Sequence, residues 1–180
     1  MTAKIGIVIG SLRKESFSRK IAENVVRLLP DGVQVEWLPV DVPMYNQDLD
    51  DSGQWPQAWT DLKSAVAQCD AYLFVTPEYN RSIPPVLKNA LDIASRPYGQ
   101  NAWAGKKGAI IGVSPGALGA FGACQVLRQG VVFLDITLLQ QPEMYIGGVD
   151  KVLDENGSAD ERTTRHLQGF VDRFMEFIGS

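Results

Sequence analysis

Three serines lie close to Arg13 in a short stretch of the chain, GSLRKESFSRK, at residues 10–20. The hydroxyls of Ser11, Ser16 and Ser18 can donate hydrogen bonds. The guanidinium of Arg13 can donate two parallel, charge-assisted bonds to one anion. An apolar run precedes this stretch and residues with helical spacing follow it, so a helix N-terminus with unpaired backbone N–H groups is expected there. Together these groups predict a loop that binds a terminal phosphate.

This loop differs from the common nucleotide-binding motifs. GxxxxGK[ST] needs a Gly-Lys pair before a hydroxyl residue, which the loop lacks, and this argues against a nucleoside triphosphatase. GxGxxG is also absent, which weakens the case for a dinucleotide-binding Rossmann site. The alternative to phosphate binding is that Ser16 caps the helix and Arg13 is a solvated charge.

Two further loops have unusual chemistry. In TPEYNRSIPP (76–85), backbone N–H and C=O groups can form hydrogen bonds with the edge of a planar heterocycle, and Tyr79 can pack beside it. The alternative is a proline-framed turn that only starts the next helix. The segment SPGALGAFGA (114–123) has Gly116, Gly119 and Gly122 where the backbone passes close to something flat or to another chain. Its alternative is close helix packing.

Strand and helix patterns alternate along the chain. Predicted strands cover residues 4–10, 33–40, 71–76 and 107–114, with a fifth somewhere in 135–146. The first two predicted helices run from Phe17 to a break at Pro30 and from around Trp55 to Val66, with Pro56 in the first turn of the second. The next two run from Pro84 and Pro85 to Ala94 and around 120–131. The last begins near Ser158, which has capping-box spacing to Glu161. This order predicts an α/β fold with an open, parallel, doubly wound sheet.

In such sheets a ligand binds outside the carboxyl ends of the strands, at the point where the strand order reverses. That rule selects the loops 10–18, 76–82 and 114–122, and in this architecture the first and third flank the second. A phosphate site at one end and a planar-ring site at the other describe FMN.

The segments GSLRKESFSRK, TPEYNRSIPPVLKNALD and SRPYG resemble the NADPH-dependent FMN reductase family, especially its bacterial chromate and quinone reductase branch. The resemblance covers nearly the whole chain. It implies a flavodoxin-like three-layer α/β/α sandwich with a five-stranded parallel sheet of order 2-1-3-4-5, formed by residues 1–180 as one domain. It also implies bound FMN, NADPH or NADH as electron donor, and a homodimer or homotetramer with the flavin near a subunit interface.

The function implied is electron transfer from NAD(P)H through FMN to quinones, flavins, azo compounds or chromate by a ping-pong mechanism. Two alternatives stay open: a non-enzymatic flavodoxin-type electron carrier and a flavin-binding regulatory module. Flavodoxins usually have a hydroxyl-rich phosphate loop of T-x-T-G type, whereas this loop contains Arg13. No catalytic acid or base is expected, because FMN carries the redox chemistry.

The resemblance assigns site residues to all three loops. It implies that the FMN phosphate and ribityl chain are held by Ser11, Arg13, Ser16, Phe17 and Ser18, and that the isoalloxazine is bordered by Pro77, Glu78, Tyr79, Asn80 and Arg81 on one side and by Ser114 and Gly116 on the other. Arg81 and Arg96 are candidates for favouring a reduced anionic flavin and anionic acceptors, and the alternative for Arg96 is a solvated helix-end charge. The sequence departs from its relatives at Pro85 and Ala120, where glycine is common.

Composition limits the possible partners and compartments. The 180 residues are 45% apolar, and a net charge of −4 with a pI near 5.0 argues against binding to nucleic acid or anionic membranes. The N-terminal apolar run is too short for a signal peptide, and no stretch could span a bilayer. Cys69 and Cys124 lack metal-ligand or redox spacing and are expected to be inert, as is His166. The cytoplasm is the expected compartment, and no metal is expected.

Overall fold

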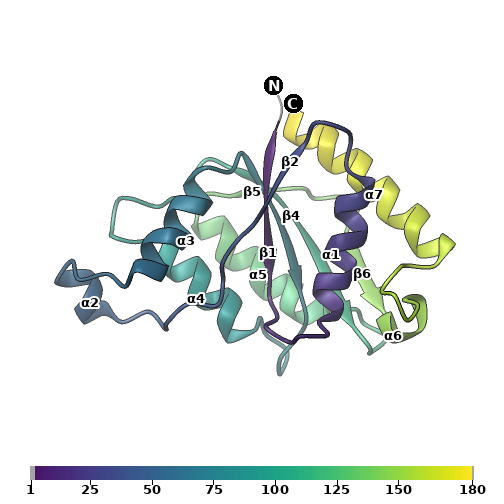
Figure 1. The fold of residues 1–180 in the computed structure, drawn as a ribbon, viewed down its shortest axis with the longest axis horizontal. Helices are drawn as coiled ribbons and strands as arrows, with labels where there is room; N and C mark the ends of the chain where they lie inside the picture. The colour runs from purple at the N-terminus through teal and green to yellow at the C-terminus, as the bar shows by residue number, and fades with distance from the viewer. Residues whose placement is uncertain (1–2, 180) are drawn as a thin grey trace.

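A central parallel sheet with helices on both faces forms the body of the molecule, in a computed structural model that describes residues 3–179 (Figure 1). Its strands are β1 (Lys4–Ile9), β2 (Gln34–Trp37), β3 (Ala71–Thr76), β4 (Lys107–Ser114), β5 (Thr137–Leu138) and β6 (Met144–Gly147). The strand order is β2-β1-β3-β4-β5. Strand β6 also pairs with β4, further along that strand than the part that pairs with β5. All pairings are parallel, so the expected flavodoxin-like α/β fold is confirmed.

Helices cover the two faces of the sheet unequally. They are α1 (Phe17–Leu28), α2 (Gln47–Asp51), α3 (Gln57–Ala67), α4 (Pro85–Ala94), α5 (Phe121–Phe133), α6 (Val149–Val152) and α7 (Glu161–Gly179). Helices α1 and α7 pack on one face, and α3, α4 and α5 pack on the other (Figure 1). The three-layer sandwich that the family resemblance implies is therefore present.

The core has two halves because successive side chains of a strand point to opposite faces. All six residues of β3 are buried. Tyr72 and Phe74 pack among α3, α4 and α5, beside the buried Trp103. Leu73 and Val75 face the other way, toward α1 and α7. This double burial explains why the strand is a continuous apolar run rather than an alternating one.

The fifth predicted strand is present as two short pieces, β5 and β6, both paired with β4. Pro142 lies between them and has no N–H group with which to continue the ladder. Strand β2 is shorter than the predicted 33–40, because it ends at Trp37. Leu38 still donates a backbone hydrogen bond to Ile7 at 3.0 Å, after which Pro39 interrupts the pairing.

Several helix starts differ from the prediction. The capping box at Ser158 is wrong: α7 begins at Glu161, and Asp160 Oδ1 accepts the hydrogen bond from the Thr163 backbone N–H at 2.7 Å. Pro56 precedes α3 as its N-cap instead of lying in the first turn. Pro85, in contrast, is the first residue of α4, where the missing N–H would have no partner in any case. The short helices α2 and α6 were not predicted.

Candidate functional site

The three selected loops meet in one cavity at the carboxyl ends of β1, β3 and β4. The cavity has a volume of about 180 Å³. Its lining residues are Ser11, Arg13, Ser16, Phe17 and Ser18 from the first loop and α1, Pro77, Glu78 and Tyr79 from the second loop, and Val113, Ser114 and Pro115 from the end of β4 and the third loop. The strand order thus brings together segments that are about sixty and about forty residues apart in the sequence, as the switch-point rule requires.

The first turn of α1 provides the polar end of this cavity. Ser16 is the N-cap of α1, and its Oγ accepts a hydrogen bond from the Arg19 backbone N–H at 3.2 Å. Ser16 and Ser18 are each 2% exposed, whereas the side chain of Arg13 is exposed and lies 5.8 Å from the centre of the Phe17 ring. Hydroxyls, a guanidinium and a helix N-terminus together form a donor set that fits a phosphate dianion.

The second loop is a tight turn that presents only part of its sequence to the cavity. Tyr79 and Ser82 exchange two backbone hydrogen bonds of 3.0 Å each. Between them Asn80 and Arg81 both have positive φ, at 50° and 65°, as a type I′ turn requires. These two residues form the exposed tip of the turn and are not among the described residues that line the cavity. Tyr79 is 46% exposed and stands at the rim.

Glu78 links the second loop to the third. Its Oε2 accepts a hydrogen bond from the Ala123 backbone N–H at 3.1 Å, in the first turn of α5. Its Oε1 lies 3.5 Å from Arg81 Nη1. A Cβ at Gly122 would lie 2.9 Å from Oε2, so the glycine leaves room for this carboxylate. The position of Glu78 is therefore fixed by a helix N-terminus, which favours a negative charge.

The glycines of the third loop serve close packing. A Cβ at Gly119, which has φ of 55°, would lie 2.7 Å from the Tyr145 carbonyl carbon of β6. Ser114 Oγ accepts the Gly116 backbone N–H at 2.9 Å, and Gly116 itself does not line the cavity. Ala120 adopts φ of 62°, a left-handed conformation that glycine adopts more readily than residues with a Cβ.

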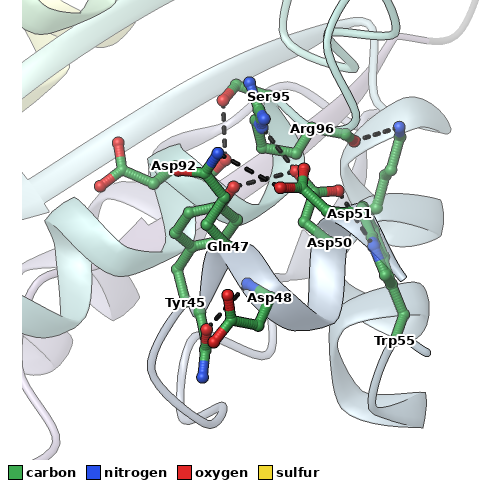
Figure 2. Close-up of polar contacts among 11 residues, drawn as sticks. Tyr45, Gln47, Asp48, Asp50, Asp51, Trp55, Asp92, Ser95 and Arg96 are labelled. Atoms are coloured by element: carbon green, nitrogen blue, oxygen red, sulfur yellow. Dashed lines mark hydrogen bonds and ion pairs between the residues drawn. The ribbon is translucent and has the colours of Figure 1, made fainter. Parts of the chain in front are cut away.

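Arg96 lies away from this cavity. It follows α4, a helix of ten residues and roughly 15 Å that begins just after the second loop, so Arg96 is at the far end of that helix. Figure 2 shows its side chain directed toward the carboxylate of Asp50 on α2, and the Nε–Oδ2 distance is 2.7 Å. Tyr45 and Trp55 donate to the same carboxylate at 2.9 and 3.1 Å. The substrate role predicted for Arg96 stays a prediction, since this chain's own cavity does not include it.

The Asp50 cluster has a definite electrostatic character. The Asp50 side chain is 2% exposed. Burial alone would raise the pKa of Asp50, but the hydrogen bonds from Arg96, Tyr45 and Trp55 outweigh it and lower the pKa below its ordinary value. The carboxylate is therefore charged at neutral pH, and it holds α2 against the end of α4.

Sequence reasoning missed two lining residues, Val113 and Pro115. They flank the predicted Ser114 at the end of the strand, but their apolar side chains give no chemical signal of their own.

Cys69 and Cys124 are buried, and burial raises their pKa values to about 11 and about 12, which keeps both thiols protonated and unreactive.

The described part of the chain contains neither a cluster of metal-ligating side chains nor a membrane-spanning helix. Within residues 3–179, no three or more His, Cys, Asp or Glu side chains are close enough together to hold a metal ion. None of the helices described is long and apolar enough to cross a membrane. His166 is exposed on α7 and does not line the cavity.

The fold places the chain in the class of flavodoxin-like α/β proteins, and the donor set at α1 is one that fits a phosphate. Comparison with known proteins leads to the family. Residues 3–151 match the model of the NADPH-dependent FMN reductase family. The chain is 46% identical over 175 residues to a quinone reductase of Pseudomonas putida, covering 97% of this chain and 94% of that one. It is 44% identical over 180 residues to a 2-hydroxy-1,4-benzoquinone reductase of a Burkholderia species, covering 99% and 97%.

A solved structure agrees with these sequence matches. The flavoenzyme NAD(P)H:(acceptor) oxidoreductase FerB of Paracoccus denitrificans has 39% sequence identity and a TM-score of 0.91, covering 98% of this chain and 97% of that one. The chain belongs to the NADPH-dependent FMN reductase family. The predictions of an enzyme, of FMN as its cofactor and of NAD(P)H as its co-substrate are thereby confirmed.

Proposed function

We propose that this protein is a quinone reductase whose cofactor lies in the cavity between the three loops. The convergence of Ser11, Arg13, Ser16 and Ser18 at the N-terminus of α1 carries the proposal, because this donor set suits the phosphate of FMN. Tyr79 at the rim and Ser114 on the opposite wall are the proposed neighbours of the isoalloxazine. The quinone as acceptor is supported by the names of the relatives from Pseudomonas and Burkholderia.

The chain's own groups bind and orient rather than react. The helix N-terminus and Arg13 fix the phosphate end, and the packed glycine loop fixes the wall opposite the second loop. FMN, when bound, supplies the transfer of electrons from reduced nicotinamide to the acceptor. The nicotinamide and the quinone use the same open side of the cavity in turn. Flavins, azo compounds and chromate are further candidate acceptors, because an open site selects acceptors weakly.

Asn80, Arg81 and Gly116 stay in the proposal as neighbours of the cavity rather than as lining groups. Arg81 is held by Glu78 at the exposed tip of the turn, where its positive charge can attract anionic acceptors.

We also propose that the protein forms a homodimer or homotetramer. The large apolar side chains of Tyr98, 92% exposed, and Phe133, 89% exposed, support an interface with another copy of the chain. The proposed compartment is the cytoplasm, supported by two buried free thiols.

Flavin binding and two-substrate kinetics test the function together. The purified protein should bind FMN with one molecule per chain in calorimetry. Initial rates with NADPH and a benzoquinone should give parallel double-reciprocal lines, because both substrates use one entrance in turn. Intersecting lines would indicate a ternary complex and separate sites, and a protein that ignores FMN would refute the proposed cavity.

A further inference from the structure

The side chain of Glu78 connects the second loop to α5. Its Oε2 accepts the Ala123 backbone N–H at 3.1 Å, and we call this contact the loop anchor. The other hydrogen bonds that residues 77–82 form with described residues stay within the stretch 76–82. The loop anchor is therefore the polar contact that relates the position of this loop to a neighbouring helix.

The helix end of the loop anchor is a rigid part of the molecule. Ala123 and Cys124 are both 0% exposed, so the first turn of α5 is packed into the core. Backbone N–H groups in a first turn have no partner within their own helix and favour a negative charge. The side chain of Glu78 is 16% exposed, which protects the hydrogen bond from competition with water.

Gly122 leaves the space that the loop anchor needs. A Cβ at this position would lie 2.9 Å from Oε2 and 3.3 Å from the carboxyl carbon of Glu78. A methyl group at residue 122 would therefore push the carboxylate aside. The end of a glutamate side chain can move without the backbone, so this substitution disturbs the anchor and leaves the fold in place.

Tyr79 is the residue whose position depends on the loop anchor. It follows Glu78 directly and is 46% exposed at the rim of the cavity. Its two backbone hydrogen bonds with Ser82, of 3.0 Å each, fix the turn to itself and not to the cavity. The distance between Tyr79 and the wall at Ser114 therefore depends on where Glu78 is held.

We propose that Glu78 is a positioning residue, which through α5 holds Tyr79 at the separation from Ser114 that the flavin ring requires. The inference rests on the proposed function, because that function places the ring between these two residues. Glu78 then acts at the ring end of the cavity, whereas Arg13 acts at the phosphate end. Loss of the loop anchor should weaken FMN and riboflavin by the same factor.

Calorimetric titration with both flavins measures this effect. Glu78→Ala should lose about ten-fold in affinity for each flavin, because a charge-assisted hydrogen bond disappears. Glu78→Gln keeps an oxygen that can accept the Ala123 N–H and should recover most of the loss. Gly122→Ala should lie between wild type and Glu78→Ala. Gly130→Ala is the matched control on the same helix, where a Cβ would meet nothing within 4 Å, and it should bind as wild type does.

A double-mutant cycle shows whether Glu78 acts through Tyr79. Tyr79→Leu alone should weaken the binding of both flavins. Adding Glu78→Ala to Tyr79→Leu should weaken it little further, because the side chain that Glu78 positions is already gone. A further ten-fold loss in the double variant, or a Glu78→Gln variant no better than Glu78→Ala, would overturn the inference.

Amide hydrogen exchange of the flavin-free protein separates this inference from the proposed function. The backbone amides of residues 79–82 should exchange faster in Glu78→Ala than in wild type or Glu78→Gln, because the turn is no longer held to α5. Faster exchange in a protein that ignores FMN would support the loop anchor and refute the FMN cavity. Equal FMN affinity in wild type and Glu78→Ala would refute the positioning role and leave the proposed function standing.

Discussion

At the residue scale, the serines of the first loop serve the helix and the proposed phosphate site together. Ser16 Oγ accepts the Arg19 backbone N–H at 3.2 Å, and the same side chain lines the cavity. A hydroxyl that accepts one hydrogen bond still has its own proton to donate. Capping and phosphate binding are therefore compatible at Ser16, although the sequence presented them as alternatives.

Arg13 is the residue whose substitution tests the phosphate site most directly. Arg13→Ala removes a charged hydrogen-bonding partner, so FMN affinity should fall by roughly 30- to 150-fold, equivalent to about 2–3 kcal/mol. Arg13→Lys should recover only part of the loss, because an ammonium cannot form the planar two-pronged contact. Calorimetric titration of each variant with FMN measures both effects.

Riboflavin is the control for Arg13, because it has the same ring without the phosphate. Its weaker binding should respond little to either substitution. Equal losses for FMN and riboflavin would assign Arg13 to the ring site or to the fold. Unchanged FMN binding would mean that the loop is only a capped helix start.

At the scale of elements, the third loop is fixed by glycines that allow backbone to approach backbone. A Cβ at Gly112 of β4 would lie 2.2 Å from the Gly119 carbonyl oxygen and 2.7 Å from Cys124 Sγ. The carbonyl cannot move without displacing the loop, because Gly119 is itself pressed against β6. The wall of the proposed FMN cavity thus depends on the close approach of the Gly112 and Gly119 backbones.

Gly112→Ala should destabilise the protein by roughly 3 kcal/mol, since the added methyl overpacks a rigid site. Gly130→Ala is the matched control on α5, where a Cβ would meet nothing within 4 Å. There the same change should stabilise by up to about 1 kcal/mol through helix propensity. Urea unfolding of the two variants measures the difference, and similar stabilities would contradict the packing argument.

At the scale of the whole molecule, Asp50 joins parts of the chain that are distant in sequence. Its carboxylate accepts hydrogen bonds from Tyr45 and Trp55 near α2 and from Arg96 after α4. Lys63 of α3 donates to the Arg96 carbonyl oxygen, which adds a third helix to the cluster. One buried charge therefore contributes to holding α2 against the ends of its neighbouring helices.

Asp50→Asn should reduce the free energy of unfolding by roughly 2 kcal/mol at neutral pH, because a buried charge-assisted network is lost. The pKa of Asp50 is lowered in the folded protein, so its stabilisation is present above its ordinary value of 3.8 and is lost as pH falls through the folded pKa. The difference between wild type and variant should therefore shrink in acid.

Urea unfolding from neutral pH down through 3.8 measures this dependence on the Asp50 charge. Asp48→Asn, at an exposed position on the same short helix, should change stability little at any pH. A difference between wild type and Asp50→Asn that stayed constant in acid would show that packing, not charge, stabilises the cluster.

The sequence by itself determined the fold class, and it predicted most of the residues of the proposed site. Continuous apolar runs such as 71–76 identify strands buried on both faces, and Pro30 and Pro85 mark helix limits because proline lacks an N–H. The order of these elements leaves few topologies, so the three loops at the strand ends were found in advance. Of the twelve predicted cofactor residues, nine line the cavity.

Only the tertiary structure decided which loop residues face the cavity and which hold the fold. The positive φ values of Asn80 and Arg81 turn the tip of the second loop away from the cavity. The partner of Arg96 is Asp50, 46 residues away, and no local pattern joins the two. The contact between Arg19 and the Trp37 ring likewise depends on β2 lying beside β1. Spacing along a chain specifies local conformation, whereas contacts between distant segments exist only once the sheet has formed.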